Sequence, residues 1–80
     1  MIISYDSVAD AVYIKIAPEA KVARTVEFAP ETFVDLTEDG ELVGIEMLNP
    51  GQLVLKQLAK KFHRPELSRI DTEKIQQAIA

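Results

Sequence analysis

Cysteine is absent from the 80-residue chain. Neither a disulfide framework nor a thiolate metal site can therefore form, and nothing in the composition indicates an oxidising compartment. The N-terminal residues lack the basic region and apolar run of a secretory signal, and no apolar stretch approaches the roughly 20 residues that a membrane span requires. We therefore expect a cytoplasmic protein with no membrane partner.

Groups for catalysis are also scarce, because histidine occurs once, at position 63. One chain can therefore build neither a histidine-containing triad nor a histidine-based metal cluster. The serines have no nucleophile-elbow motif, and the glycines at positions 40, 44 and 51 form no phosphate loop. We predict no enzyme, no catalytic or metal-binding residue and no cofactor, and we interpret His63 as a helix-end cation.

Charge is unevenly distributed along the chain. Residues 1–51 hold ten acidic and three basic side chains, whereas residues 52–80 hold three acidic and six basic ones. An acidic first part favours protein contact over phosphate binding. The basic strip of the second part, which we expect to be mainly a solvated helix face, comprises Lys56, Lys60, Lys61, Arg64 and Arg69.

Alternating apolar and polar residues predict five short strands in the first fifty residues. Each is joined to the next by a brief connection, which favours an antiparallel β-meander. The first three predicted strands cover residues 1–5, 11–17 and 22–28, and the last two are the alternating runs within residues 32–48 that Asp39-Gly40 joins.

Asp39-Gly40 between the last two strands predicts a hairpin with a two-residue type I′ turn, which needs positive φ at both positions. A three-residue loop with Gly40 left-handed is the alternative, and it pairs Leu36 with Leu42. We reject it because it would place Asp35 on the apolar face. The expected pairs are Leu36 with Val43, Val34 with Ile45, and Thr32 with Met47.

Residues after position 49 predict two helices. Asn49 suits an N-cap and Pro50 a first helical position, Leu55 and Leu58 begin an apolar stripe at helical spacing, and Pro65 stops the helix. Residues 71–80 predict a second helix, capped by Asp71. The fold class is therefore α+β, a single small domain of residues 1–80 with a β-meander over 1–49, packed against a helical tail over 50–80.

Uncovered apolar surface predicts self-association. Phe33, Leu42 and Leu48 fall on the face of the predicted sheet opposite to Val34, and the short second helix needs packing to persist. We expect a homodimer, the commonest closed assembly, or a larger homo-oligomer, with the C-terminal helix docked across the two-fold axis. The competing account is that this helix folds back onto its own sheet.

The sequence contains two motifs, Tyr5-Asp6-x-x-x-Asp10-Ala11-x-Tyr13-Ile14 and Val34-Asp35-Leu36-x-Glu38-Asp39-Gly40-x-Leu42-Val43-Gly44-Ile45-Glu46. Together they resemble the small prokaryotic proteins called the domain of unknown function 2283 family, over roughly residues 1–50. The resemblance implies an antiparallel sheet in a small stand-alone protein with no established activity, and, by analogy with relatives suspected of lying beside toxin-like genes, an antitoxin-like role. Thr37, where the family usually has Asp, and the longer helical tail are departures.

Tyrosines and carboxylates supply the candidate site. Each phenol could donate to a carboxylate and so bind a ligand or transfer a proton, although tyrosines that pack in strands and aspartates that hold a turn explain the same pattern better. The tyrosine–carboxylate cluster near the first turn comprises Tyr5, Asp6, Asp10 and Tyr13, and the candidate site residues also include Asp35 and Glu46 of the hairpin.

A calcium-loop spacing also occurs, because Asp35, Thr37, Asp39 and Gly40 are followed five residues later by Glu46. In a hairpin, however, Asp35 and Asp39 lie about 13 Å apart along the strand, too far for one ion. We interpret these as turn and strand residues.

The sequence thus favours a non-enzymatic protein-interaction or self-associating module. The alternative is a nucleic-acid-associated regulator or antitoxin-like partner that uses the basic strip. A weaker alternative is metal binding at the hairpin of residues 35–46.

Overall fold

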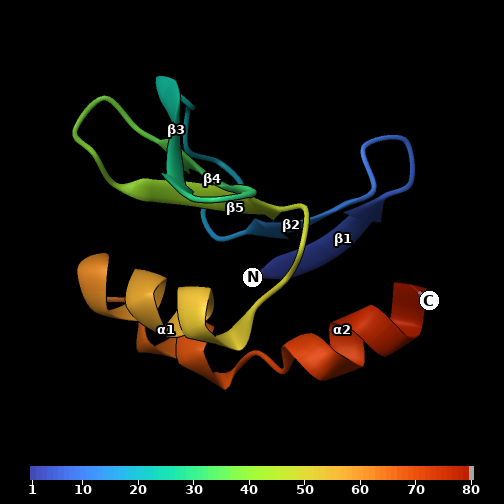
Figure 1. The fold of residues 1–80 in the computed structure, drawn as a ribbon. Coiled ribbons are helices and arrows are strands. Elements are labelled where there is room, and N and C mark those ends of the chain that lie inside the picture. The colour runs from blue at the N-terminus through green and yellow to red at the C-terminus, as the bar shows by residue number, and fades with distance from the viewer. Residues whose placement is uncertain (80) are drawn as a thin grey trace. The chain divides into compact units, whose positions relative to one another are not determined.

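The computed structural model describes residues 1–79. It contains two compact units, which divide between Asn49 and Pro50. The first is a five-stranded antiparallel sheet, and the second holds two α-helices and a short 3₁₀-helix (Figure 1). The predicted α+β class is confirmed. Among the described residues, no helix has both the length and the apolar character needed to traverse a lipid bilayer.

The strands follow the predicted alternation closely, although the order in the sheet differs from a meander. The order is β1-β2-β5-β4-β3, so β2 pairs with β5 instead of β3. All pairs are antiparallel. The strands are β1 (Ile2–Asp6), β2 (Ala11–Lys15), β3 (Arg24–Ala29), β4 (Thr32–Leu36) and β5 (Leu42–Met47).

The connection between β2 and β3, residues 16–23, explains this order. After β2, the backbone N–H groups of Ile16 and Ala17 donate to Val43 O at 2.9 and 3.0 Å. Before β3, Ala23 N donates to Leu36 O at 2.8 Å. The segment therefore crosses the end of the β4–β5 hairpin and delivers β3 to the far edge, as in a Greek key. The predicted meander is wrong here because the connection is too long for a tight hairpin.

The β4–β5 hairpin combines the two registers that the sequence presented as alternatives. Thr32 pairs with Met47 and Val34 with Ile45 as predicted, but Leu36 pairs with Leu42. Val43 is therefore an extra residue in β5, a β-bulge.

The turn of this hairpin is correspondingly not type I′. Gly40 has φ +86°, whereas Asp39 is not among the positive-φ residues of the described chain. Thr37 N donates to Glu41 O at 2.9 Å, which closes a three-residue loop. The rejection of the three-residue loop was therefore wrong. The bulge adds one residue to β5, so Asp35 pairs with Gly44 and lies on the polar face.

One face of the sheet is buried and apolar. Its central row runs from Ile14 through Ile45 to Val34, all at most 2 % exposed. Leu42, which the sequence placed on the opposite face, is only 3 % exposed, like Val43, because the bulge sets both residues against Leu36.

The helical unit begins later than predicted. Helix α1 covers Gln52–Lys61 with Gly51 at its N-cap, so Asn49 is not the cap. The chain then leaves α1 at His63, whose φ is +56°, and Arg64 N donates to Ala59 O at 2.9 Å. This is the hydrogen bond of a Schellman motif, which ends the helix before Pro65 is reached.

Two further helices follow in this unit. The sequence missed the 3₁₀-helix η1 (Pro65–Arg69), which contacts α1. Helix α2 covers Thr72–Ile79. Asp71 Oδ1 accepts from Glu73 N at 3.0 Å, so the predicted cap is confirmed. Ala80, to which the prediction extended the helix, lies outside the described residues.

Two glutamine side chains link these segments. The Gln52 amide donates to Ile70 O at 2.7 Å, and its carbonyl oxygen accepts from Thr72 N and Oγ1, each at 3.3 Å. Gln76 adds a hydrogen bond to Pro50 O at 3.1 Å. These contacts give the tail a fixed internal arrangement.

Candidate functional site

The first tyrosine–aspartate pair lies at the turn between β1 and β2. Tyr5 Oη donates to Asp10 Oδ1 at 2.5 Å, and both side chains are exposed. Asp10 has φ +53°, a left-handed conformation that Asp tolerates better than most residues. Asp6 Oδ1 accepts from Val8 N and Ala9 N at 2.9 and 3.3 Å. Both aspartates therefore build the turn, as the simpler interpretation of the sequence proposed.

The second tyrosine–aspartate pair, Tyr13 and Asp35, lies on the less apolar face of the sheet. Tyr13 is on β2 and Asp35 is on β4, and β5 lies between these two strands. Tyr13 Oη, from β2, donates to Asp35 Oδ2, on β4, at 2.6 Å. Thr25 Oγ1, from the edge strand β3, donates to Asp35 Oδ1 at 2.6 Å. Both carboxylate oxygens of Asp35 therefore accept a hydroxyl group, and we call Tyr13, Asp35 and Thr25 the polar row.

Gly44 of β5 makes the polar row possible. It pairs with Lys15 on one side and Asp35 on the other, so it lies between Asp35 and the strand that carries Tyr13. The tyrosine crosses β5 at this glycine, and a Cβ atom added there would overlap the Tyr13 hydroxyl and ring. Close approach of a side chain to the backbone is a positional use of glycine in a strand.

Electrostatics sets the chemistry of Tyr13. Partial burial, followed by the hydrogen bond to Asp35 and the charges of Asp35 and Glu46, raises the pKa of its phenol above the ordinary value. The phenol therefore remains protonated and acts as a donor. A proton-transfer role would require a pKa moved toward neutral pH, and this environment moves it away.

Glu46 completes the half-buried part of this face. It pairs with Tyr13 and with Phe33, and all three side chains are partly exposed. The hairpin spacing that resembles a calcium loop does not converge on one point. Within residues 1–79, no three His, Cys, Asp or Glu side chains gather in a way that could hold a metal ion.

The six candidate residues thus fall into two groups. Tyr5 pairs with Val12 and so shares the face of the buried core, whereas Tyr13 lies on the opposite face. The turn group is Tyr5, Asp6 and Asp10, and the opposite-face group is Tyr13, Asp35 and Glu46. Sequence reasoning missed Thr25 and Gly44, although an isolated glycine inside a strand pattern is a recognised signal of close approach.

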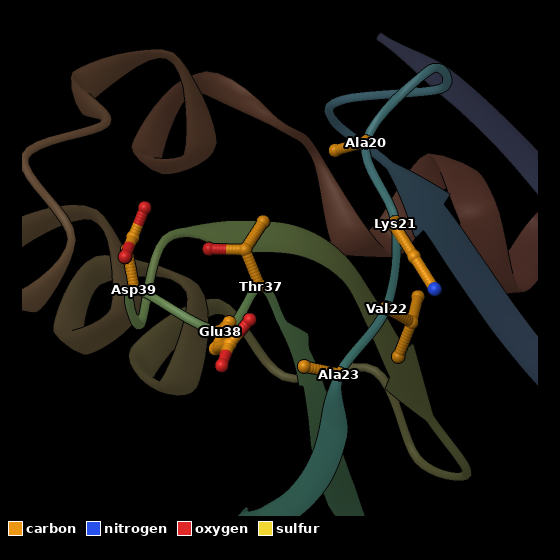
Figure 2. Close-up of a pocket in the computed structure, with 7 residues that line it drawn as sticks. All are labelled: Ala20, Lys21, Val22, Ala23, Thr37, Glu38 and Asp39. Carbon is orange, nitrogen blue, oxygen red and sulfur yellow. The ribbon is translucent and has the colours of Figure 1, made fainter.

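A concavity of about 580 Å³ lies beside the hairpin loop, between residues 20–23 and 37–39 (Figure 2). Glu38 and Asp39 stand on the loop side, and Ala20 and Ala23 lie opposite. Nearby, Arg24 Nη1 donates to Thr37 O at 3.4 Å, which ties β3 to the loop. The residues that line the concavity are few and carry charges of both signs, so they define no ligand class.

The basic strip lies in the helical unit. Lys56, Lys60 and Lys61 are exposed on α1, which contains no acidic residue. His63 is exposed at the Schellman position, just after this helix. It lies at the end of the helix where the prediction placed a cation.

Fold and site together define a small α+β protein with a five-stranded antiparallel sheet, whose half-buried face carries a tyrosine–aspartate–threonine row over a strand glycine. The family model described as "Protein of unknown function (DUF2283)" matches residues 2–49. The chain therefore belongs to this family, and the resemblance inferred from its motifs is confirmed. Comparisons with curated proteins and with solved structures give no match.

Proposed function

We propose that the protein is a non-enzymatic interaction module that binds another protein, or a second copy of itself, through the β1 edge of its sheet. β1 is the terminal strand of the sheet, and all its residues are exposed. Ile2, Ile3 and Tyr5 are 58 %, 43 % and 40 % exposed. An edge strand presents unpaired backbone N–H and C=O groups, which accept an added strand.

The contrast with the other edge carries this proposal. β3 bears Arg24 and Glu27, and its pairing with β4 is interrupted between Glu27 and Ala29. Charged residues and bulges are the devices by which proteins block edge-to-edge pairing. β1 pairs with β2 without a shift, and its only charge is Asp6 at the end. Only β1 has the features of a receptive edge.

The polar row supports a role without catalysis. Asp35 has both oxygens engaged by hydroxyl groups, and Tyr13 keeps its proton. Such a satisfied network rigidifies a sheet, and offers neither a base nor a nucleophile.

Two matched variants test the proposal. Ile3 and Val26 are 43 % and 42 % exposed, and the strand register places them on the same face at opposite edges. If the partner is a second copy, sedimentation equilibrium at micromolar concentration should give about twice the 8.9 kDa chain mass. Ile3→Lys should weaken the association of the protein with itself, or with a partner co-purified from its host, and Val26→Lys should not. Equal behaviour of the two variants contradicts the proposal.

A second candidate function is contact with nucleic acid, in the manner of an antitoxin-like regulator. The three exposed lysines of α1, with no acid on the same helix, favour it. Binding to random duplex DNA should then weaken steeply with salt, because each neutralised phosphate releases a counterion. No detectable binding at about 50 mM salt removes this candidate.

A further inference from the structure

We infer that the partner at the β1 edge is a second copy of this chain, joined by antiparallel pairing of the two β1 strands about a two-fold axis at Ser4. The inference rests on the proposed function and adds the identity and register of the partner. The two sheets then form one continuous sheet across the axis.

Symmetry restricts the register. A two-fold axis perpendicular to the sheet keeps each face continuous, and it must pass midway between one residue and its own copy, which therefore pair with each other. β1 runs from Ile2 to Asp6, so its midpoint is Ser4. Centring on Ser4 is the one symmetric register that pairs all five residues of the strand.

The cross-strand pairs in this register are favourable. Ile3 faces the partner's Tyr5, and Ser4 faces the partner's Ser4. Pairs of an aromatic with a β-branched residue, and of two hydroxyl residues, are stabilising when directly opposite. Ile3 and Tyr5 lie on the face of the buried core, because they pair with Ile14 and Val12. Their exposed apolar surface would then continue into that of the partner.

Charges fit the same register. Each Asp6 faces the partner's Ile2, so the two Asp6 residues lie about 13 Å apart along the strands, beyond the roughly 8 Å screening length at physiological salt. Ile2 pairs with Lys15 of β2. Lys15 therefore lies in the same row and on the same face as the partner's Asp6. Its side chain is exposed and long enough to reach across Ile2.

Cross-linking through a new cysteine tests the contact directly. The chain has no cysteine, so Ser4→Cys introduces a single thiol. A short bismaleimide should link most of this variant into covalent dimers at the concentration where the native chain is dimeric. The control is Val8→Cys, in the turn, where the side chain is 96 % exposed and lies outside the predicted contact. It should cross-link at least tenfold more slowly, and equal rates would overturn the inference.

Charge reversal tests the register. Ser4→Glu and Ser4→Lys each place like charges opposite one another in the symmetric pair, so each variant should sediment as a monomer. An equimolar mixture should recover the dimer, because Glu then faces Lys. Circular dichroism melting verifies that both variants remain folded. A dimer that persists in both variants, or a mixture that stays monomeric, overturns the inference.

The outcomes separate this inference from the proposed function. The native chain could be monomeric at all concentrations and yet lose a co-purified partner on Ile3→Lys. That result would contradict the inference that the partner is a second copy, and it would support the proposal that β1 is a receptive edge. A dimer sensitive to Ile3→Lys but without Ser4 cross-linking contradicts only the register. Insensitivity to Ile3→Lys contradicts both.

Discussion

Two tyrosine–aspartate hydrogen bonds of nearly equal length have different surroundings in this protein. Tyr5 reaches Asp10 across a turn five residues away, at an exposed edge. Tyr13 reaches Asp35 across a neighbouring strand, twenty-two residues away in sequence and partly buried. Local chain geometry makes the first bond, whereas the pairing of three strands makes the second.

The causes of the pKa shifts reflect this difference. The hydrogen bond to Asp10 is the main reason that the pKa of Tyr5 is raised, whereas partial burial is the main reason for Tyr13. A hydrogen bond in water exchanges with solvent at little net gain, but a partly buried carboxylate that loses a donor incurs a desolvation cost. We therefore expect the two pairs to respond differently to the same substitution.

Gly44→Ala should have the largest effect on stability. The added methyl group overlaps Tyr13, so the tyrosine must leave Asp35 or the strands must separate. Overpacking typically costs about 1–3 kcal/mol, and the lost hydrogen bond adds to this. Urea unfolding measures the change. In a double-mutant cycle, Tyr13→Ala should suppress most of the effect of Gly44→Ala; additive losses would mean that Tyr13 is not the obstacle.

Tyr13→Phe should destabilise the protein by about 1–2 kcal/mol, because it removes one of the two donors to Asp35. Ring and packing are retained, so the change isolates the hydrogen bond. Chemical denaturation followed by circular dichroism gives the difference. A loss indistinguishable from zero would show that water replaces the phenol at Asp35.

Raising the pH above about 10 should lower the stability of the native protein more than that of the Tyr13→Phe variant. A phenol whose pKa is higher in the folded state than in the unfolded chain contributes stability that is fully present below about pH 10, and that is lost as pH rises through the folded-state pKa. The pKa of both tyrosines is raised, so stability should fall above pH 10. Absorbance titration should show Tyr13 ionising after Tyr5. The reverse order would contradict the burial of Tyr13.

Tyr5→Phe should change the unfolding midpoint much less than Tyr13→Phe, since both partners of its hydrogen bond are exposed. Thermal melting of the two variants side by side provides the comparison. Equal losses would remove the distinction between the turn pair and the strand pair.

Glu46→Ala should have the smallest effect on stability, within about 0.5 kcal/mol. Its charge contributes last among the causes that raise the pKa of Tyr13, so the variant should lower that pKa slightly. Absorbance titration measures the shift, and a large loss of stability would indicate a buried interaction of this carboxylate.

Much of this fold was predictable because its signals are local. Alternation located the first three strands to within two residues at every boundary and placed β4 and β5 within the hairpin of residues 32–48, and Asp71 marked the start of α2. The hairpin turn was only half predictable. Asp39-Gly40 signals a turn, but whether the loop holds two or three residues depends on the bulge at Val43, which no local pattern encodes.

The candidate site was less predictable than the fold. The sequence identified Tyr13 and Asp35 separately, and proximity in sequence grouped Tyr13 with Tyr5 and Asp10. Thr25 reaches Asp35 only because β3 crosses to the far edge and pairs with β4.

By itself, then, the sequence determined where strands and helices form, because side-chain periodicity and turn residues act within a few positions of the chain. The tertiary structure alone decided which strands are neighbours, and hence that Tyr13 crosses Gly44 to Asp35 while β1 lies at one edge of the sheet. The physical reason is that strand pairing joins backbone groups that are alike at every position. The choice among neighbours therefore depends on the packing of the whole sheet.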